Sequence, residues 1–314
     1  MLNVGIIGLG QIATRVAKGI KFAKNANLYA VASRDINKAI TFKQAHDAQK
    51  AYDDYSKLCA DQNVDVVYIC TPNTLHKEHI MLALSHHKHV ICEKPIFTKL
   101  EDLDACFQYA KKQGCLLMEA HKTVFTPLNQ HLFNLISKGI IGKVHFIEGQ
   151  YASEVLPSQK AISKWHFEAE GGGCLYDIGV YPLAFANYFA HSKIKEYQLM
   201  EHKVDGIYCD QAQAMITYEN GIMAHIATSW QCDMVNMGYI YGEKGHIEYH
   251  NFWKNTQAYL VKDGQKTLIE VDMDSDFTGE IEHAIACIEQ GLCQSNIMSQ
   301  EASKEILKVI TKKV

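Results

Sequence analysis

The first 120 residues alternate between two patterns of hydrophobic and polar positions. Short, nearly continuous apolar runs are separated by stretches in which apolar residues recur every three or four positions. The runs occupy residues 2–7, 28–33, 64–70, 89–93 and 115–120. Continuous apolar strands that alternate with amphipathic helices are typical of a parallel sheet covered by helices on both faces. We therefore expect residues 1–120 to form a doubly wound α/β domain.

The pattern changes after residue 120. Pro127 marks the start of a helix, Gly139 follows its end, and residues 143–153 are predicted to form a long strand. Three hairpins and two closing helices are predicted next. The hairpins pair 212–218 with 222–230, 237–241 with 246–249, and 258–261 with 267–271; the helices span 280–290 and 300–312. Residues 121–314 are therefore predicted to form an α+β domain with an open, mostly antiparallel sheet; the family resemblance given below implies that this domain binds substrate and mediates oligomerisation.

The hairpin over residues 211–230 is apolar at odd and even positions alike. Because neighbouring side chains of a strand point to opposite faces, both faces of this hairpin need cover. Helices of the domain can cover one face only. We expect a second copy of the chain to cover the other, as a homodimer that pairs sheet to sheet.

Composition excludes several classes of protein. The 314 residues carry 31 basic and 35 acidic side chains, a balance without the basic footprint of a nucleic-acid-binding protein. No apolar stretch reaches the ~18–20 residues of a membrane span, and the amino terminus lacks the basic start of a secretory signal. The ten cysteines show no paired spacing, which indicates free thiols in a reducing cytoplasm.

Residues 8–13, Gly-Leu-Gly-Gln-Ile-Ala, fit the G-x-G-x-x-G/A pattern of dinucleotide-binding sites. The match begins where the first strand ends and the first helix starts. Gly8 permits the tight turn, Gly10 lets the backbone approach a pyrophosphate, and Ala13 lets the helix pack closely. Gln11 and Ile12 open the helix whose amino terminus faces the phosphates. The sequence therefore predicts a dinucleotide site here.

The end of the second strand decides between two dinucleotides. NAD sites place an acidic residue there for the ribose hydroxyls, whereas residues 32–35 read Ala-Ser-Arg-Asp. The guanidinium of Arg34 beside Ser33 suits the 2′-phosphate of NADP, in a chain that otherwise has only one arginine. The alternative is a solvated arginine next to an Asp35 that caps the following helix. We favour NADP, with NAD still possible.

Further candidates for chemistry follow later strands. Residues 71–73 (Thr-Pro-Asn) and 93–95 (Glu-Lys-Pro) each follow an apolar strand, where ligands bind in open α/β sheets. Lys94 is expected on the nicotinamide side of the cleft, and the Lys94–Pro95 bond is a candidate for cis. In the second domain three glycines, 171–173, precede Asp177 and Tyr181. Their spacing of four places both side chains on one face of a helix.

Together these motifs resemble the Gfo/Idh/MocA family of oxidoreductases, over essentially the whole chain and in the same order. The motifs are Gly8-x-Gly10-x-x-Ala13, Thr71-Pro72-Asn73 with His76, Glu93-Lys94-Pro95, and Gly-Gly-Gly-x-Leu-x-Asp-x-Gly at 171–179. The resemblance implies a Rossmann domain followed by an open-faced sheet domain, with Lys94 and Asp177 in the catalytic site and His76 near the cofactor. The expected cofactor-binding residues are Gly8, Gly10, Gln11, Ile12, Ser33, Arg34, Thr71, Pro72, Asn73, His76, Glu93 and Lys94.

Tyr181 stands where many members of the family have histidine. This resembles the branch of dimeric dihydrodiol dehydrogenase and NADP-dependent xylose dehydrogenase, in which tyrosine takes the acid/base role. Tyrosine has an ordinary pKa of about 10, too high for a base at neutral pH, and a nearby ammonium lowers it. We therefore assign Tyr181 as general acid/base, Lys94 as its electrostatic partner, and Asp177 as the group that orients them or binds a second hydroxyl. The alternatives are a core tyrosine and a solvated lysine at a strand end.

Other residues carry weaker signals. Trp165 and His166 precede the glycines and are candidates to line the substrate pocket, with a packing tryptophan as the alternative. His76 and His79 share a helix face, but no cysteine or carboxylate cluster completes a metal site, so we expect none.

The expected function is an NADP-dependent dehydrogenase or reductase acting at a carbinol carbon of a sugar, polyol or dihydrodiol. The alternative is a non-catalytic NADP-binding regulator on the same fold, which would be free to lose Lys94, Asp177 and Tyr181. No residue pattern identifies the polyhydroxylated substrate or the direction of the reaction.

Overall fold

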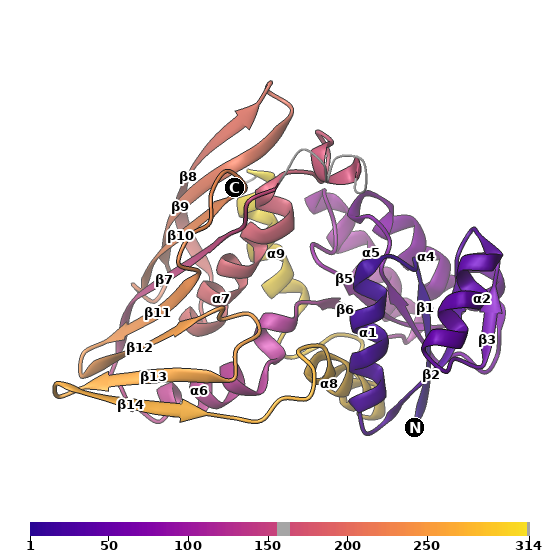
Figure 1. Ribbon diagram of the computed structural model, residues 1–314, viewed down its shortest axis with the longest axis horizontal. Helices are drawn as coiled ribbons and strands as arrows, with labels where there is room; N and C mark the ends of the chain where they lie inside the picture. The colour runs from indigo at the N-terminus through magenta and orange to yellow at the C-terminus, as the bar shows by residue number, and fades with distance from the viewer. Residues whose placement is uncertain (156–163, 313–314) are drawn as a thin grey trace. The chain divides into compact units, whose positions relative to one another are not determined.

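The computed structural model describes residues 1–155 and 164–312. The chain divides by its internal contacts into two compact units (Figure 1). The first unit comprises Met1–Phe125 and Asp274–Lys304, and the second comprises Thr126–Met273 and Glu305–Val314. A segment from near the end of the chain therefore packs with the amino-terminal half. The division of function expected at residue 120 stays a prediction.

The first unit is built on a six-stranded parallel sheet in the order β3-β2-β1-β4-β5-β6. The strands are β1 (Leu2–Ile7), β2 (Ala26–Ala32), β3 (Lys50–Tyr52), β4 (Val66–Ile69), β5 (His89–Glu93) and β6 (Leu117–Ala120). This is the strand order of a doubly wound dinucleotide-binding fold, and it confirms the predicted fold class. β3 escaped prediction because three residues, one of them lysine, make no apolar run.

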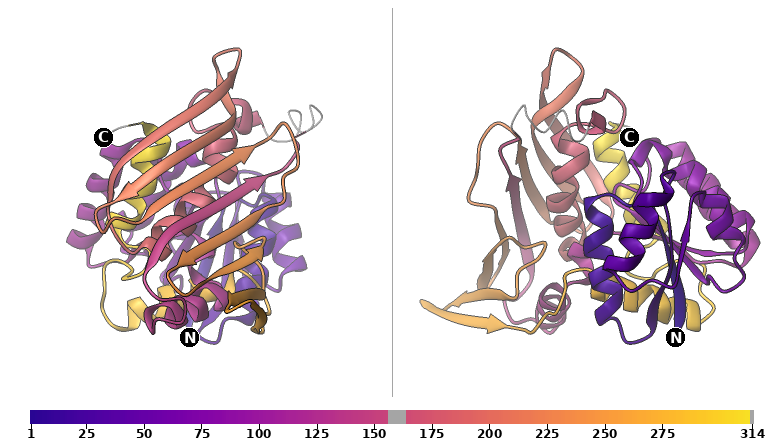
Figure 2. Two further views of the ribbon diagram at one scale, coloured as in Figure 1. Left: turned by 90° about the vertical axis from the view of Figure 1, so that its left-hand side faces the viewer. Right: turned by 45° about the vertical axis from the view of Figure 1, so that its right-hand side comes forward.

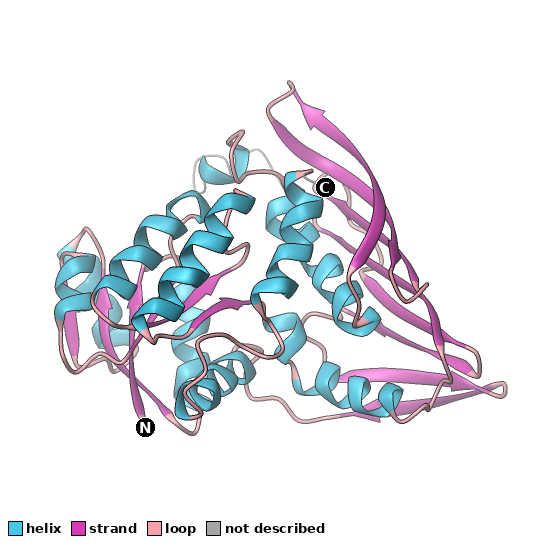
Figure 3. Ribbon diagram, turned by 180° about the vertical axis from the view of Figure 1, so that it is seen from behind, coloured by secondary structure: helices cyan, strands magenta, loops and turns pink. Residues whose placement is uncertain are grey.

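Helices cover this sheet (Figure 3). They are α1 (Gln11–Phe22), α2 (Ile36–Ala45), α3 (Tyr55–Ala60), α4 (His76–Ser85), α5 (Leu100–Gln113) and α8 (Thr278–Glu289), with short 3₁₀ turns at Asn73–Leu75 and Lys122–Phe125. α8 comes from the late segment and packs against α1. A Cβ on Gly19 of α1 would lie 2.6 Å from the Cβ of Phe277, so the glycine permits this close approach.

The second unit contains an eight-stranded sheet in the order β14-β13-β12-β11-β7-β10-β9-β8. The strands are β7 (Val144–Ala152), β8 (Ile194–Val204), β9 (Tyr208–Tyr218), β10 (Met223–Ser229), β11 (Met237–Gly242), β12 (Gly245–His250), β13 (Gln257–Lys262) and β14 (Gln265–Glu270). The three predicted hairpins are confirmed as β9–β10, β11–β12 and β13–β14. β7 and β10 pair in parallel, and the other pairs are antiparallel. The sheet is thus mostly antiparallel, as predicted.

One face of this second sheet carries helix α7 (Val180–Ala190), which packs on β7, where a Cβ on Gly149 would lie 3.1 Å from Pro182. Helix α6 (Pro127–Ser137) belongs to the same unit, and α9 (Gln300–Thr311) runs from the first unit into the second. The left view of Figure 2 shows the other face of the sheet with no helix over it. On β9, Ala212, Ala214 and Ile216 are buried, while the alternate residues Gln211, Gln213 and Met215 are exposed.

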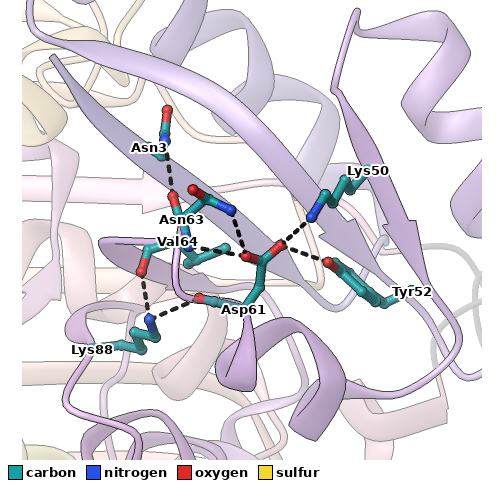
Figure 4. Close-up of polar contacts among 7 residues, drawn as sticks. All are labelled: Asn3, Lys50, Tyr52, Asp61, Asn63, Val64 and Lys88. Carbon is teal, nitrogen blue, oxygen red and sulfur yellow. Dashed lines mark hydrogen bonds and ion pairs between the residues drawn. The ribbon is translucent and has the colours of Figure 1, made fainter.

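A polar network secures the amino-terminal edge of the first sheet (Figure 4). The Asp61 carboxylate accepts hydrogen bonds from the Tyr52 hydroxyl at 2.6 Å, the Lys50 ammonium at 2.9 Å and the backbone N–H of Asn63 at 2.9 Å. Lys88 donates to two carbonyls of the same loop at 2.8 and 2.7 Å. Burial opposes ionisation of Asp61, but these hydrogen bonds outweigh it and hold its pKa below the usual value. The negative charge of Asp61 is therefore stabilised by these three hydrogen-bond donors.

Candidate active site

The turn between β1 and α1 has the shape that a pyrophosphate requires. Gly8 has φ +83°, and a Cβ there would lie 2.7–2.8 Å from atoms of Cys70 and Thr71, so only glycine fits. Gly10 is the N-cap of α1, and a Cβ there would meet nothing within 4 Å. Ala13 is wholly buried where the helix packs. A glycine turn with open space before a helix amino terminus fits the diphosphate of NAD or NADP, with Gln11 and Ile12 in the first turn.

At the end of β2, the Asp35 carboxylate makes a hydrogen bond to the helix that follows it. The Asp35 side chain accepts a hydrogen bond from the backbone N–H of Asn37 at 2.9 Å and caps α2, as predicted. The buried Ser33 hydroxyl accepts from the backbone N–H of Asp35 at 3.2 Å. Arg34 between them is exposed, and its charge acts on Tyr55 and His79. Arg34 thus presents an exposed positive charge at this strand end, next to the exposed Asp35.

His76 joins the loops that follow β4 and β5. One ring nitrogen, Nε2, lies 2.9 Å from the carbonyl oxygen of Thr71, and the other, Nδ1, lies 3.1 Å from that of Pro95. Burial lowers the pKa of His76 to about 4, so the ring is neutral near pH 7. The Lys94–Pro95 peptide bond is cis, as predicted. A neutral ring carries a single N–H, so His76 donates to one of these two loops and packs against the other. Pro72 and the buried Asn73 lie on the first of these loops.

Two buried carboxyl groups flank Lys94 at the ends of β5 and β6. Glu93 precedes the lysine, and the Glu119 carboxylate accepts a hydrogen bond from the backbone N–H of Ile96 at 3.1 Å. The Lys94 charge acts on both carboxyl groups. Burial raises the pKa of Glu119 to about 7. Glu119 was not among the predicted site residues, although a lone carboxylate in an apolar strand is a signal that points to it.

In the second unit, Asp177 and Tyr181 follow the glycine loop. Leu175–Gly179 forms a π-helical turn that runs into α7, so Asp177 lies on the π turn and Tyr181 in the first turn of α7. The regular α-helix assumed from their spacing is thus wrong at its start. Such wide turns are frequent at functional sites.

Glycines hold the Trp165–His166 segment against this turn. A Cβ on Gly172 would lie 2.7 Å from the carbonyl oxygen of His166, which also accepts a hydrogen bond from the backbone N–H of Gly173 at 2.7 Å. His166 Nε2 lies 3.9 Å from an Asp177 carboxylate oxygen, and the two side chains are each 24% exposed. Trp165 stacks on the His166 ring with centroids 3.7 Å apart. The structure therefore brings Trp165, His166 and Asp177 together at a solvent-accessible position.

Aromatic residues fix the Tyr181 ring. It lies edge-on to Tyr151 at 5.6 Å and tilted to Trp253 at 6.2 Å, and these two rings stack on each other at 3.7 Å. Neither Tyr151 nor Trp253 was predicted, because they come from strand β7 and a distant loop. Lys94 belongs to the first unit and Tyr181 to the second, so their pairing stays a prediction.

Within 1–155 and 164–312, no three histidine, cysteine, aspartate or glutamate side chains gather in a way that could hold a metal ion. None of the described helices is long and apolar enough to cross a membrane.

Comparisons with known proteins define the class of the chain. The model of an oxidoreductase family with an NAD-binding Rossmann fold matches residues 2–121, and the model of the GFO/IDH/MocA C-terminal domain matches residues 129–248. The chain belongs to the Gfo/Idh/MocA family, which confirms the resemblance seen in its motifs. It is an NAD(P)-dependent oxidoreductase.

Its relatives include trans-1,2-dihydrobenzene-1,2-diol dehydrogenases. The one from Xenopus laevis is 29% identical over 98% of this chain and 95% of its own, and the one from Homo sapiens is 26% identical over the same shares. The fold is shared with the aldose-aldose oxidoreductase of Caulobacter crescentus, at a TM-score of 0.90 and 23% identity over 99% of this chain and 96% of the other. It is also shared with KijD10, a 3-ketoreductase of Actinomadura kijaniata solved with NADP, at a TM-score of 0.86 and 23% identity over 98% and 95%.

Proposed function

We propose that the protein interconverts a hydroxyl and a carbonyl group on a sugar, polyol or dihydrodiol, with NADP as the preferred cofactor. The observation that carries the cofactor choice is the end of β2, where Asp35 caps a helix and Arg34 remains exposed beside Ser33. A guanidinium there binds a 2′-phosphate, whereas a carboxylate occupied as a cap is not oriented for ribose hydroxyls. KijD10 has been solved with NADP, and the relatives are named for a dihydrodiol, which agrees with both parts of the proposal.

The nicotinamide ring, when bound, supplies or accepts the hydride. Tyr181 moves the substrate hydroxyl proton, because its ring is fixed by Tyr151 and Trp253 and its hydroxyl is the ionisable group of that turn. Lys94 stabilises the tyrosinate and polarises the substrate oxygen. Asp177, with His166 at 3.9 Å, binds a second hydroxyl and so selects polyhydroxylated substrates. Trp165 supplies an apolar wall beside it.

The test is a screen of aldoses, inositols and dihydrodiols, with nicotinamide absorbance followed separately for NADP and NAD. We expect turnover of at least one class, with kcat/KM higher for NADP. Tight NADP binding without turnover on any compound of the panel would replace this proposal with that of a dinucleotide-sensing regulator.

We further propose a cytoplasmic homodimer joined through the uncovered face of the second sheet. Tyr239 and Tyr241 stack there at 5.6 Å, Phe146 lies 6.2 Å from Tyr241, and Met215 is 43% exposed. Glu148 and His225 lie between Tyr239 and Met215 on this face, and a mixture of aromatic, apolar and polar side chains is typical of a protein interface. Light scattering at micromolar concentration should give twice the chain mass, and a monomer mass removes the proposal. Free thiols suit a reducing compartment, which cell fractionation tests.

A further inference from the structure

A chain of buried polar groups lies next to Lys94 within the first unit. The Tyr68 hydroxyl, on β4, lies 2.6 Å from Oε1 of Glu280 and 3.1 Å from Oε1 of Glu93. Tyr68 and Glu280 are 0% exposed, and Glu93 is 7% exposed. The second oxygen of Glu280, Oε2, is buried and has no hydrogen-bond partner among the described residues. Glu280 comes from α8, so the late segment reaches the strand end that carries Lys94.

The arrangement of Glu93, Tyr68 and Glu280 determines how many protons the two carboxyl groups share. A phenol carries one proton and donates it to one carboxylate only. If both carboxyl groups were ionised, two like charges would face one phenol in a dry interior, and one of the two oxygen–oxygen contacts would hold no proton. With one proton on the pair, one carboxyl group donates to the phenol and the phenol donates to the other. Glu93 and Glu280 thus share a single proton through Tyr68.

The surrounding charges decide which carboxyl group keeps that proton. Burial raises the pKa of both carboxyl groups, and the Tyr68 hydrogen bond opposes this rise at both. The Lys94 charge opposes it at Glu93. Burial, followed by the charge of Glu93, raises the pKa of Glu280 well above its usual value. The charge of Lys122, which is ion-paired with Asp276, lowers the pKa of both carboxyl groups. The titratable or charged groups that face the pair are Lys94, Lys122, Asp276, Cys70, Cys92 and Glu119.

We propose that Glu280 is a positioning residue: it keeps the shared proton, so that Glu93 remains a carboxylate, hydrogen-bonded by Tyr68, beside the ammonium of Lys94. A fixed negative charge on the residue before Lys94 orients this ammonium for the substrate oxygen. The inference rests on the catalytic role proposed for Lys94. It gives α8 a part in the chemistry of a strand end that lies far from it in the sequence.

Infrared spectroscopy of the protein without cofactor tests the proton's location independently of activity. A neutral buried carboxylic acid absorbs at a carbonyl frequency distinct from that of a carboxylate. All spectra are recorded in a Glu119→Gln background, because Glu119 has a pKa of about 7 and contributes such a band itself. We expect the band to be present, to vanish in Glu280→Gln and to persist in Glu93→Gln. Any other pattern overturns the proposal.

Kinetics test the effect on Lys94. Tyr68→Phe removes the hydrogen bond that favours the Glu93 carboxylate, so the acid limb of the kcat/KM profile should move up by about one pH unit. Glu280→Leu keeps the Tyr68 hydroxyl but removes the donor that directs it toward Glu93, so it should move the acid limb in the same direction by less. Glu280→Gln, whose amide still donates to Tyr68, should leave the limb where it is in the wild type. Asp61→Asn is the matched control, since it breaks a buried carboxylate network away from this site.

The two kinds of failure are distinguishable. If Tyr68→Phe lowers stability as Asp61→Asn does and leaves the pH profile unchanged, Glu280 has a structural role only and the proposal falls. If Lys94→Met retains full activity, the catalytic role of Lys94 fails; if no compound of the panel is turned over, the proposed function fails instead. The infrared pattern then still reports whether Glu280 holds the proton.

Discussion

The two edges of the parallel sheet in the first unit handle buried carboxyl groups in opposite ways. At the amino-terminal edge, Asp61 is surrounded by donors from Lys50, Tyr52 and Asn63, and its pKa is lowered although burial opposes this. At the carboxyl-terminal edge, burial raises the pKa of Glu93 and Glu119. At the first edge the hydrogen bonds stabilise the charged form of Asp61 and thereby the folded state. The second edge, where ligands of such sheets bind, keeps Glu119 as a carboxyl group that can change charge near neutral pH.

The largest expected effect is on activity at the carboxyl-terminal edge. Lys94→Met should lower kcat/KM by about 10³-fold, because the charge that stabilises the reacting oxygen is lost. NADP affinity, measured by fluorescence titration, should change far less. Asp61→Asn at the opposite edge should keep kcat/KM near that of the wild type. Equal losses in the two variants would erase the functional contrast between the edges.

A second loss of activity is expected in Tyr181→Phe, since Tyr181 and Lys94 are proposed to act in the same proton-transfer step. We expect a loss of about 10³-fold in kcat, within the range of general acid–base catalysis. Near-normal kcat in Tyr181→Phe combined with a strong loss in Lys94→Met would exchange the two roles.

The next effect concerns the cofactor. Arg34→Ala should raise the KM for NADP about 100-fold, because a charge-assisted contact to a phosphate is lost, and leave the KM for NAD within about twofold. Arg15→Ala is the control, as this arginine pairs with Asp276. If the ratio of the KM values for NADP and NAD is unchanged in Arg34→Ala, Arg34 is a solvated arginine that does not bind the 2′-phosphate.

A smaller effect is on the pH dependence of stability at the carboxyl-terminal edge. The pKa of Glu119 is raised from 4.5 to about 7, so its stabilising contribution is present below pH 4.5 and is lost as pH rises to about 7. Urea titrations across this interval should show the free energy of unfolding falling by about 2 kcal/mol from this group. Glu119→Gln should flatten that part of the curve. A wild-type slope retained in the variant contradicts the assignment.

The smallest effect has the opposite sign and lies at the other edge. The pKa of Asp61 is lowered, so its contribution is present above the usual carboxyl pKa and is lost as pH falls below it. Asp61→Asn should lower the free energy of unfolding by about 1 kcal/mol at neutral pH, since donors from exposed Lys50 are partly screened. The difference between variant and wild type should shrink in acid. If the difference in unfolding free energy between Asp61→Asn and wild type grows in acid, the two edges of the sheet do not differ in the way described.

Much of this molecule was predictable because its signals are local. The apolar runs, the glycines at 8 and 10 and the Asp35 cap each depend on a few neighbouring residues, and the structure places them as expected. β8 was missed because its polar and apolar residues alternate at an edge without an apolar run. The Tyr68–Glu280 hydrogen bond was missed because the two residues are 212 positions apart. Nothing near Glu280 in the sequence indicates that it lies next to a strand of the first unit.

The late segment of the first unit also constrains how the chain is made. Residues 274–304 leave the ribosome after the whole eight-stranded sheet has been synthesised, yet α1 and Tyr68 need them for cover. The unit whose synthesis begins first is therefore completed only after the strands of the second sheet have been made, and the α1 surface of a nascent chain stays uncovered until then. Fragments cut at residue 125 should inherit that exposed surface permanently.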